Sequence, residues 1–594
     1  MHNLSEITLS NFRSCTHAAF PLSEFTPLVG YNNGGKSNLL DSIRWLLRPY
    51  SLGTTDFNNA LSPVIVSGAI RGITPELLEN LIEPHRNRIT PFCRHGTLGI
   101  RRTQMSPGIT ASNIILEIRN LDENDVDSEG AWVKNPTGID AAIKTLFPEP
   151  IEIGAMEDAI EDIGKSKSSS TIGKLIAEIM QPIEQQYGAE MRKTLDGIKQ
   201  RLEADGTDRA PELNQFDEGA NEKLKDIFPG IRIRLHVPTP EIRTLFKDGT
   251  IRVFEEGENN GREIAQVGHG AQRSIQMALV RYLAEMKAAT SAPLVARTLL
   301  LIDEPELYLH PQAIEQVRLA LKTLAMKGYQ VIFATHSPQM IDKADIGNTL
   351  IICKTIGRGT HARKRLSDAV NETIQDAPSQ VRILFELSNL SKILFSDHVL
   401  IVEGATEEKL LPVIFHRIKG YTLSARRIAL VRIDGSGNIV KAMRILDAIG
   451  IPTKALVDLD YAFRDARKAG LLDGNDTDIN ACCAYCSSVS QKCGFTLAED
   501  GFPKSNEIMN ASVAFAVLAT HKDLEDNILM IHNKLKERNV WLWKKGTFED
   551  HLGIVGKGES AWAQCAQDIQ QNGCEISIAD YAGIEGLVDW IDTE

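Results

Sequence analysis

The feature that most constrains this chain is the loop GYNNGGKS, residues 30 to 37, which has the spacing G-x-x-x-x-G-K-S. The apolar run 25 to 29 before it predicts a buried strand, and residues 37 to 47 after it have the apolar spacing of a helix. A glycine-rich turn between a strand and a helix directs backbone N–H groups and the positive helix end at phosphate oxygens. The chain is therefore predicted to contain a nucleotide-binding α/β domain.

The polar positions of this loop have distinct expected roles. We expect Lys36 to contact the β- and γ-phosphates of ATP, and the Ser37 hydroxyl to bind Mg²⁺. The loop as a whole is expected to line the phosphates through Gly30, Asn32, Asn33, Gly34, Gly35, Lys36, Ser37 and Asn38.

A second strand-like segment extends the predicted site. Residues 296 to 311, ARTLLLIDEPELYLHP, are an apolar run that ends in Asp303 and Glu304. A carboxylate at a strand end beside a magnesium nucleotide holds the metal's water shell, and the next carboxylate polarises the attacking water. We therefore expect Asp303 to serve the metal and Glu304 to act as the catalytic base.

Two more segments complete the nucleotide motifs. YQVIFATHSPQMI, residues 329 to 341, places His336 at a strand end, where it either contacts the γ-phosphate side of the site or is a structural residue. In VGHGAQRSIQMALVRYLAE, residues 267 to 285, Gly268 and Gly270 begin a predicted helix. The helix start is expected to receive a phosphate from a neighbouring subunit, the alternative being an ordinary helix cap.

Length and charge narrow the class of protein. A chain of 594 residues indicates about three to four domains. It contains no run of about 18 apolar residues and no basic leader followed by an apolar stretch, so we expect a cytoplasmic protein without a membrane role. The net charge of −13 argues against a chain that is basic throughout, and it still allows a local basic groove.

The cysteines leave two interpretations open. Nine cysteines without a signal peptide do not favour a disulfide framework. Four of them cluster in ACCAYCSSVSQKC, and they either hold zinc or are ordinary thiols: Cys482, Cys483, Cys486 and Cys493.

Three strand-like segments in the last third of the chain end in carboxylates. The segments are DHVLIVEGATEE, RIALVRIDGSG and PTKALVDLDYAF. The carboxylates concerned are Glu403, Glu407, Asp434, Asp458 and Asp460. Because α/β sheets build their sites at the carboxyl ends of strands, and because hard oxygen ligands suit Mg²⁺ or Mn²⁺, this pattern predicts a divalent-metal site. The alternative is a metal-free flavodoxin-like domain with acidic loops.

The nucleotide motifs resemble those of the ABC-type ATPase heads of the SMC/RecF group. GYNNGGKSN resembles a Walker A loop, LLLIDEPELYLHP a Walker B segment, and FATHSP the switch histidine. VGHGAQ is a looser form of the signature, and ITLSNFRS resembles the first strand of those heads, which implies that Arg13 lies close to the nucleotide. The later carboxylates resemble the Toprim motifs, with Glu403 in VEG and Asp458 and Asp460 in DLD.

An ABC head followed by Toprim resembles the overcoming lysogenization defect (OLD) family of nucleases, which includes the Gabija A subunits. The resemblance implies a catalytic lysine in NVWLWKKGTFEDHL, which is Lys545 or, as the alternative, Lys544. It also implies that Glu549 joins the metal shell or caps a helix, and that the metal carboxylates act in two-metal DNA cleavage. The expected cofactors are ATP and Mg²⁺ or Mn²⁺. The expected partners are DNA, a second copy of this chain in a dimer or higher oligomer, and a helicase or another defence-system protein.

The expected fold class is therefore α/β: an ABC-type (SMC/RecF-like) ATPase head with a helical insertion, followed by a Toprim α/β domain. We expect the ATPase at 1–154 and 231–380 and Toprim with C-terminal elements at 381–594. The helical insertion at 155–230 is expected to be a dimerisation arm, the alternative being a helical lid of a monomer. The segments 113–121, 231–237 and 249–258 are predicted strands of the antiparallel sheet of the head.

The expected activity is that of an ATP-hydrolysing, metal-dependent DNA endonuclease in anti-phage defence or DNA processing. One rival is an ABC-type DNA-binding clamp or repair ATPase in which Toprim is only structural. The other rival is a topoisomerase or primase, for which too little chain remains to supply the extra domains.

Overall fold

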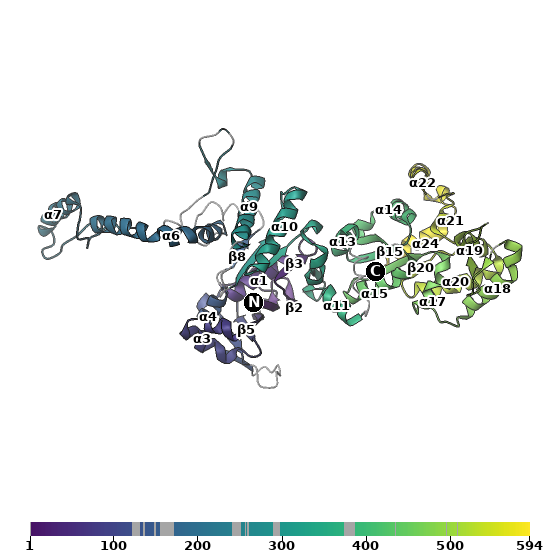
Figure 1. Cartoon of the computed structure of the whole chain (residues 1–594), viewed down its shortest axis with the longest axis horizontal. Coiled ribbons are helices and arrows are strands. Elements are labelled where there is room, and N and C mark those ends of the chain that lie inside the picture. The colour runs from purple at the N-terminus through teal and green to yellow at the C-terminus, as the bar shows by residue number, and fades with distance from the viewer. Residues whose placement is uncertain are drawn as a thin grey trace. The chain divides into compact units, whose positions relative to one another are not determined.

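The computed structural model describes residues 2–120, 131–134, 137–147, 150–154, 171–239, 251–255, 257, 260–288, 297–373, 387–433, 435–494, 496–507, 509–556 and 558–593 (Figure 1). Packing divides the chain into two compact units, Met1–Pro27 with Ser37–Thr335 and Leu28–Lys36 with His336–Glu594. The chain thus passes from one unit to the other within the predicted phosphate loop. Among these described residues, no helix combines the length and the apolar character needed to cross a membrane.

The first unit contains an antiparallel and a parallel set of strands. Six strands pair antiparallel in the order β7-β6-β5-β4-β1-β2, and three pair in parallel in the order β12-β11-β8. Buried and half-buried residues alternate along β4, as expected for a strand with one face on a core. The bounds are β1 Asn3–Phe12, β2 Cys15–Pro21, β4 Val64–Arg71, β5 Thr97–Gln104, β6 Ile115–Arg119, β7 Trp132–Lys134, β8 Ile151–Ile153, β11 Thr298–Asp303 and β12 Tyr329–Ala334.

Helices of this unit include a long insertion. Helix α6 has 32 residues and is therefore about 48 Å long, and α7 lies beyond its far end (Figure 1). The predicted helical segment begins at residue 155, and residues 155–170 lie outside the described residues. The bounds are α1 Lys36–Leu47, α2 Pro75–Glu79, α3 Glu83–Ile89, α4 Ile139–Leu146, α6 Thr171–Leu202, α7 Pro211–Lys225, α9 His269–Ala288 and α10 Pro311–Met326.

Two of the three strands predicted for the antiparallel sheet of the head are absent from it. The segment 113–121 contains β6 of that sheet, but residues 231–237 form no strand. The segment 249–258 contains β9 (Arg252–Val253), whose one partner among the described strands is β10 (Arg262–Glu263). The backbone of Ile233 bonds the Asn221 side chain through both its N–H and its carbonyl, and Leu235 N–H donates to Asp217. Side chains of α7 thus take the hydrogen bonds that a neighbouring strand would have made, which is why the alternating apolar pattern gave a wrong prediction.

The second unit begins with the phosphate loop and a small group of strands. The end of β3 (Phe25–Val29) pairs in parallel with β13 (Leu350–Thr355), which pairs antiparallel with β14 (Gly359–Ala362). Helices α11 (Leu366–Thr373) and α13 (Leu387–Leu394) follow, and the predicted domain boundary at 380 lies between them, outside the described residues.

A four-stranded parallel sheet forms the rest of this unit, in the order β16-β15-β17-β20. The bounds of its strands are β15 His398–Val402, β16 Ile428–Arg432, β17 Thr453–Val457 and β20 Val540–Leu542. The helices around it are α14 Ala405–Lys419, α15 Ile439–Ala448, α16 Leu459–Phe463, α17 Asp465–Lys468, α18 Thr477–Cys493, α19 Ala511–Ala519, α20 Lys522–Lys536, α21 Phe548–Leu552, α22 Glu559–Asn572, α23 Cys574–Ser577 and α24 Tyr581–Asp592, and a short hairpin is made by β18 Thr496–Leu497 and β19 Pro503–Lys504.

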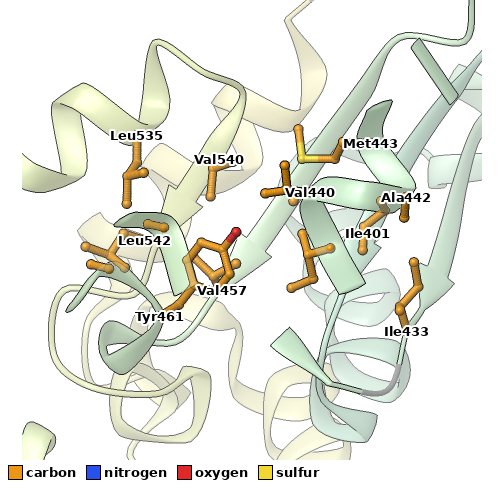
Figure 2. Packing of buried hydrophobic residues seen from close by; sticks show 14 of the residues in the cluster. Ile401, Ile433, Val440, Ala442, Met443, Val457, Tyr461, Leu535, Val540 and Leu542 are labelled. Atoms are coloured by element: carbon orange, nitrogen blue, oxygen red, sulfur yellow. The ribbon is translucent and has the colours of Figure 1, made fainter. Parts of the chain in front are cut away.

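Alternate residues of these strands supply two separate hydrophobic cores. Ile401 and Val457 belong to the cluster that contains α15 and α20, whereas Leu400 and Leu456 belong to the cluster with α14 and α24. Figure 2 shows part of the first cluster, where side chains from the sheet pack against side chains from helices α15 and α20. Because helices cover both faces, the central residues of the strands are apolar, and the carboxyl ends of the strands remain the place where polar side chains gather.

Candidate nucleotide and nuclease sites

The phosphate loop needs glycine at two positions. Gly30 has φ of +143°, and a Cβ there would lie 2.1 Å from the Ile352 carbonyl oxygen. Gly35 has φ of +102°, and a Cβ would lie 2.4 Å from Thr360 Oγ1. Both residues are therefore fixed by backbone conformation and by close approach to β13 and β14.

The loop lysine lies against the predicted switch histidine. Lys36 Nζ donates to the carbonyl oxygens of Gly30, at 3.0 Å, and Tyr31, at 2.9 Å. The same atom lies 2.9 Å from His336 Nε2. An ammonium can only donate, so Nε2 accepts and the ring proton belongs on Nδ1. The structure thus brings together two predicted site residues that are 300 positions apart in sequence.

In the first unit, the hydroxyl and the carboxylate that are predicted to serve the magnesium ion contact each other. Ser37 Oγ donates to Asp303 Oδ2 at 2.6 Å. Glu304, the predicted base, follows the end of β11 with φ of +49°, and its N–H donates to Ala334 O. A non-glycine residue in this region is strained, so the turn must be held by its surroundings.

Arg273 is the residue that holds this turn, and sequence reasoning missed it. The side chain is buried on α9, and its Nη2 donates to the carbonyl oxygens of Asp303 and Glu304, at 2.6 and 2.5 Å. Nη1 donates to Gly154 O at 3.1 Å. Burial lowers the pKa of Arg273 to about 10. The signal in the sequence was an arginine directly after Gln272, inside the predicted signature helix.

Other predicted nucleotide residues lie near the start of α1 or α9. The Arg13 guanidinium donates to Asn38, Asp41 and Asp56, and Asn38 in turn donates to Ser14 Oγ. Gly268 directly precedes α9, and Gly270 lies in its first turn. Asn32 and Asn33 are exposed on the loop.

The predicted nuclease residues follow the carboxyl ends of adjacent parallel strands. Glu403 follows β15, Asp458 follows β17 as the residue before α16, and Lys545 lies three residues beyond β20. Asp434 follows β16 in sequence and lies outside the described residues. The sheet topology therefore brings the segments after β15, β17 and β20 to the same edge of the sheet.

Glu407 and Asp460 show how the carboxylates are accommodated. Glu407 is buried in the first turn of α14, and a Cβ at Gly404 would lie 2.1 Å from its Oε2, so glycine leaves the space that this carboxylate fills. Burial raises the pKa of Asp460. A carboxylate that is buried at a desolvation cost gains stability from a bound cation, so this donor set suits a hard divalent metal.

Glu549 is connected to the same helix start. It is buried on α21 and accepts a hydrogen bond from Thr406 Oγ1 at 2.5 Å. Thr406 Oγ1 also accepts from Trp562 Nε1 at 3.1 Å. Thr406 lies between the predicted ligands Glu403 and Glu407 in sequence, yet only the fold shows that it positions Glu549.

Residues 543–547, the loop between β20 and α21 that carries Lys545 (the lysine loop), are hydrogen-bonded to the turn that carries Asp458 and Asp460. Leu459 N–H, between Asp458 and Asp460, donates to Gly546 O at 2.8 Å, and Trp543 N–H donates to Val457 O at 2.9 Å. Lys545 Nζ pairs with Asp580 Oδ1 at 3.2 Å. A hydrogen bond from His551, together with Lys545, holds the pKa of Asp580 well below its usual range.

The predicted carboxylates that the structure describes do not form a complete metal-binding cluster. Within the described ranges, no group of three or more His, Cys, Asp or Glu side chains is close enough to hold a metal ion. The described cysteines of α18, of which Cys482 and Cys486 are buried, also form no such group. All nine cysteines are free thiols.

Comparisons with known proteins match both parts of the chain. A model described as "Overcoming lysogenization defect protein-like, TOPRIM domain" matches residues 394–460, and one described as "AAA ATPase domain" matches residues 116–341. The Old nuclease of Escherichia phage P2 is 38% identical over 600 residues and covers 99% of both chains.

More distant relatives cover less of the chain. The endonuclease GajA of Bacillus cereus strain VD045 is 22% identical, over 70% of this chain and 68% of its own. A crystal structure of the Smc head bound to the winged-helix domain of ScpA covers 62% of this chain and 99% of that chain, at 17% identity and a TM-score of 0.36. The expected order, an ATPase followed by a Toprim domain, is confirmed by the two family models.

Proposed function

Because the chain belongs to the OLD family and is an ATP-dependent DNA nuclease of that family, we propose that its Toprim carboxylates and Lys545 cleave DNA phosphodiesters under the control of the ATPase. The observation that carries this proposal is the hydrogen bond between Leu459 N–H and Gly546 O, because it joins the two aspartates to the lysine loop. Residues more than 80 positions apart are thereby held at one sheet edge.

The ATPase and Toprim domains imply ATP and divalent metals in general. We assign the nuclease metals, Mg²⁺ or Mn²⁺, to the predicted carboxylates at the carboxyl ends of the strands: Glu403, Glu407, Asp434, Asp458, Asp460 and Glu549. Two such metals supply activation of the attacking water and stabilisation of the leaving oxygen. The protein's own contribution is to orient these oxygens, which Gly404 and Thr406 do for Glu407 and Glu549.

Lys545 supplies a positive charge beside these carboxylates. Its side chain is 55% exposed, so the ammonium is accessible to a phosphate. An ammonium has three donors, and the bond to Asp580 uses one of them. The remaining donors are suited to the negative charge that develops on the phosphate oxygens in the transition state.

In the ATPase, Lys36 and Ser37 bind the phosphates and the magnesium ion, Asp303 holds the metal's shell, and Glu304 is the base. Gly268 and Gly270 at the start of α9 receive the nucleotide of a second subunit, which makes the active form at least a dimer. Nucleotide-dependent pairing of the ATPases then controls DNA access to the nuclease site. The similarity to GajA supports a role in anti-phage defence.

The test is parallel plasmid-nicking and ATPase measurements on Glu403→Ala and Asp458→Ala. We expect nicking of supercoiled plasmid with Mg²⁺ or Mn²⁺ to disappear in both variants, because each lacks a metal ligand. ATP hydrolysis is expected to persist. Glu537→Ala, which changes an exposed glutamate C-terminal to α20, is the control and should nick normally. Wild-type nicking by Glu403→Ala and Asp458→Ala would refute the site.

A further inference from the structure

Asp580 directly precedes α24, but its carboxylate does not cap that helix. An aspartate at the residue before a helix usually accepts hydrogen bonds from the first-turn N–H groups. No such side-chain bond is made by Asp580. The carboxylate instead meets Lys545 Nζ through Oδ1, at 3.2 Å, and His551 Nδ1 through Oδ2, at 2.5 Å. The side chain is thus directed toward the lysine loop at the expense of its own helix.

His551 provides a second connection to the same lysine. The ring is 2% exposed, and its Nε2 lies 3.1 Å from the backbone nitrogen of Lys545. An N–H can only donate, so Nε2 accepts, and Nδ1 carries the proton that is donated to Asp580. If Nε2 also carried a proton, its N–H would face the Lys545 N–H, and neither group could accept. Asp580 therefore contacts Lys545 directly at the ammonium and, through His551, at the backbone nitrogen.

The fold reserves space for the Asp580 carboxylate. A Cβ at Gly583, in the first turn of α24, would lie 2.4 Å from Asp580 Oδ2 and 3.0 Å from its Cγ. Glycine is a poor helix former, so its presence here costs helix stability and gains room for the carboxylate. The Asp580 N–H also donates to His551 O at 2.9 Å. Backbone and side chains together fix this carboxylate in place.

We propose that Asp580 is a positioning residue for Lys545, acting through its ion pair and through His551 to place the ammonium against the DNA phosphate. The proposal rests on the proposed function, in which Lys545 contacts that phosphate. A lysine side chain has four rotatable torsions, and a half-exposed ammonium without a fixed partner would sample many positions. Holding both its backbone and its tip selects the few conformations from which it stabilises the transition state.

The experiment measures kcat and KM for plasmid nicking in full-length variants. Asp580→Asn removes the charge that holds the ammonium, and Gly583→Ala displaces the carboxylate without removing any hydrogen-bonding group. Both should lower kcat by about tenfold and leave KM nearly unchanged. Gly586→Ala is the control on the same helix, because its Cβ would make only an ordinary contact, 3.7 Å from Trp541. Its kcat should equal that of the wild type.

A double-mutant cycle distinguishes positioning from a general structural role. If Asp580 acts through Lys545, Asp580→Asn should have no further effect on kcat in the Lys545→Ala background. Equal losses in both backgrounds, or wild-type kcat in both Asp580→Asn and Gly583→Ala, would overturn the inference. Wild-type nicking by Lys545→Ala alone would instead remove the proposed role of Lys545, and with it the basis for positioning.

Discussion

The replacement of Arg273 by methionine tests what holds the turn of Asp303 and Glu304 at the end of β11. Methionine keeps an apolar stem inside α9 but removes the bonds to the carbonyl oxygens of Asp303 and Glu304. A hydrogen bond with a charged donor contributes about 1.5–3 kcal/mol, so the two bonds together contribute about 3–6 kcal/mol. Glu304 then relaxes from its strained φ of +49° and loses the orientation of its carboxylate.

Since each ~1.4 kcal/mol corresponds to a factor of ten in rate, we expect kcat for ATP hydrolysis to fall by at least about 10²-fold. ATP binding, measured by equilibrium titration with a fluorescent analogue, should change little, because the phosphate loop is intact. Arg281→Met is the matched control, an exposed arginine on the same helix, and it should hydrolyse ATP normally. A kcat for Arg273→Met within twofold of the wild type would refute this account of the turn.

Three further predictions concern single side chains. Glu304→Gln should bind ATP and fail to hydrolyse it, because an amide cannot act as a base; undiminished turnover would contradict the assignment. Thr406→Val, which removes the hydroxyl bonded to Glu549 and Trp562, should lower nicking at least tenfold, whereas Thr406→Ser should retain most of it; equal rates in the two variants would exclude a role for the hydroxyl. Burial lowers the pKa of His532 from 6.5 to about 4. Between these two pH values the unfolded chain binds more protons than the folded chain, so the free energy of unfolding decreases as the pH falls from 6.5 to about 4. The decrease is up to ~3 kcal/mol, so Tm should depend less steeply on pH in His532→Gln, and an unchanged slope would count against this contribution.

The sequence by itself determined the parts whose chemistry depends on local spacing. The eight residues from Gly30 to Ser37 define a phosphate loop, because its glycines, lysine and hydroxyl must follow one another along a single turn. The strand ends at Asp303, Glu403 and Asp458 were also predicted, since an apolar run followed by a carboxylate is a local signal. Which of these residues act as site residues stays a prediction.

Only the tertiary structure decided which residues support these groups. Thr406 and Glu549 are 143 positions apart, and His551, on α21, and Asp580, directly before α24, are 29 apart. No local pattern specifies such pairs, because hydrogen bonds between separate elements depend on how the sheet order and the helix packing bring side chains together. The apolar alternation at 231–237 shows the same limit, since Asn221 and Asp217 took the backbone bonds that would have made it a strand. A backbone group bonds whichever partner the fold places within reach, and the sequence of one segment does not state what lies beside it.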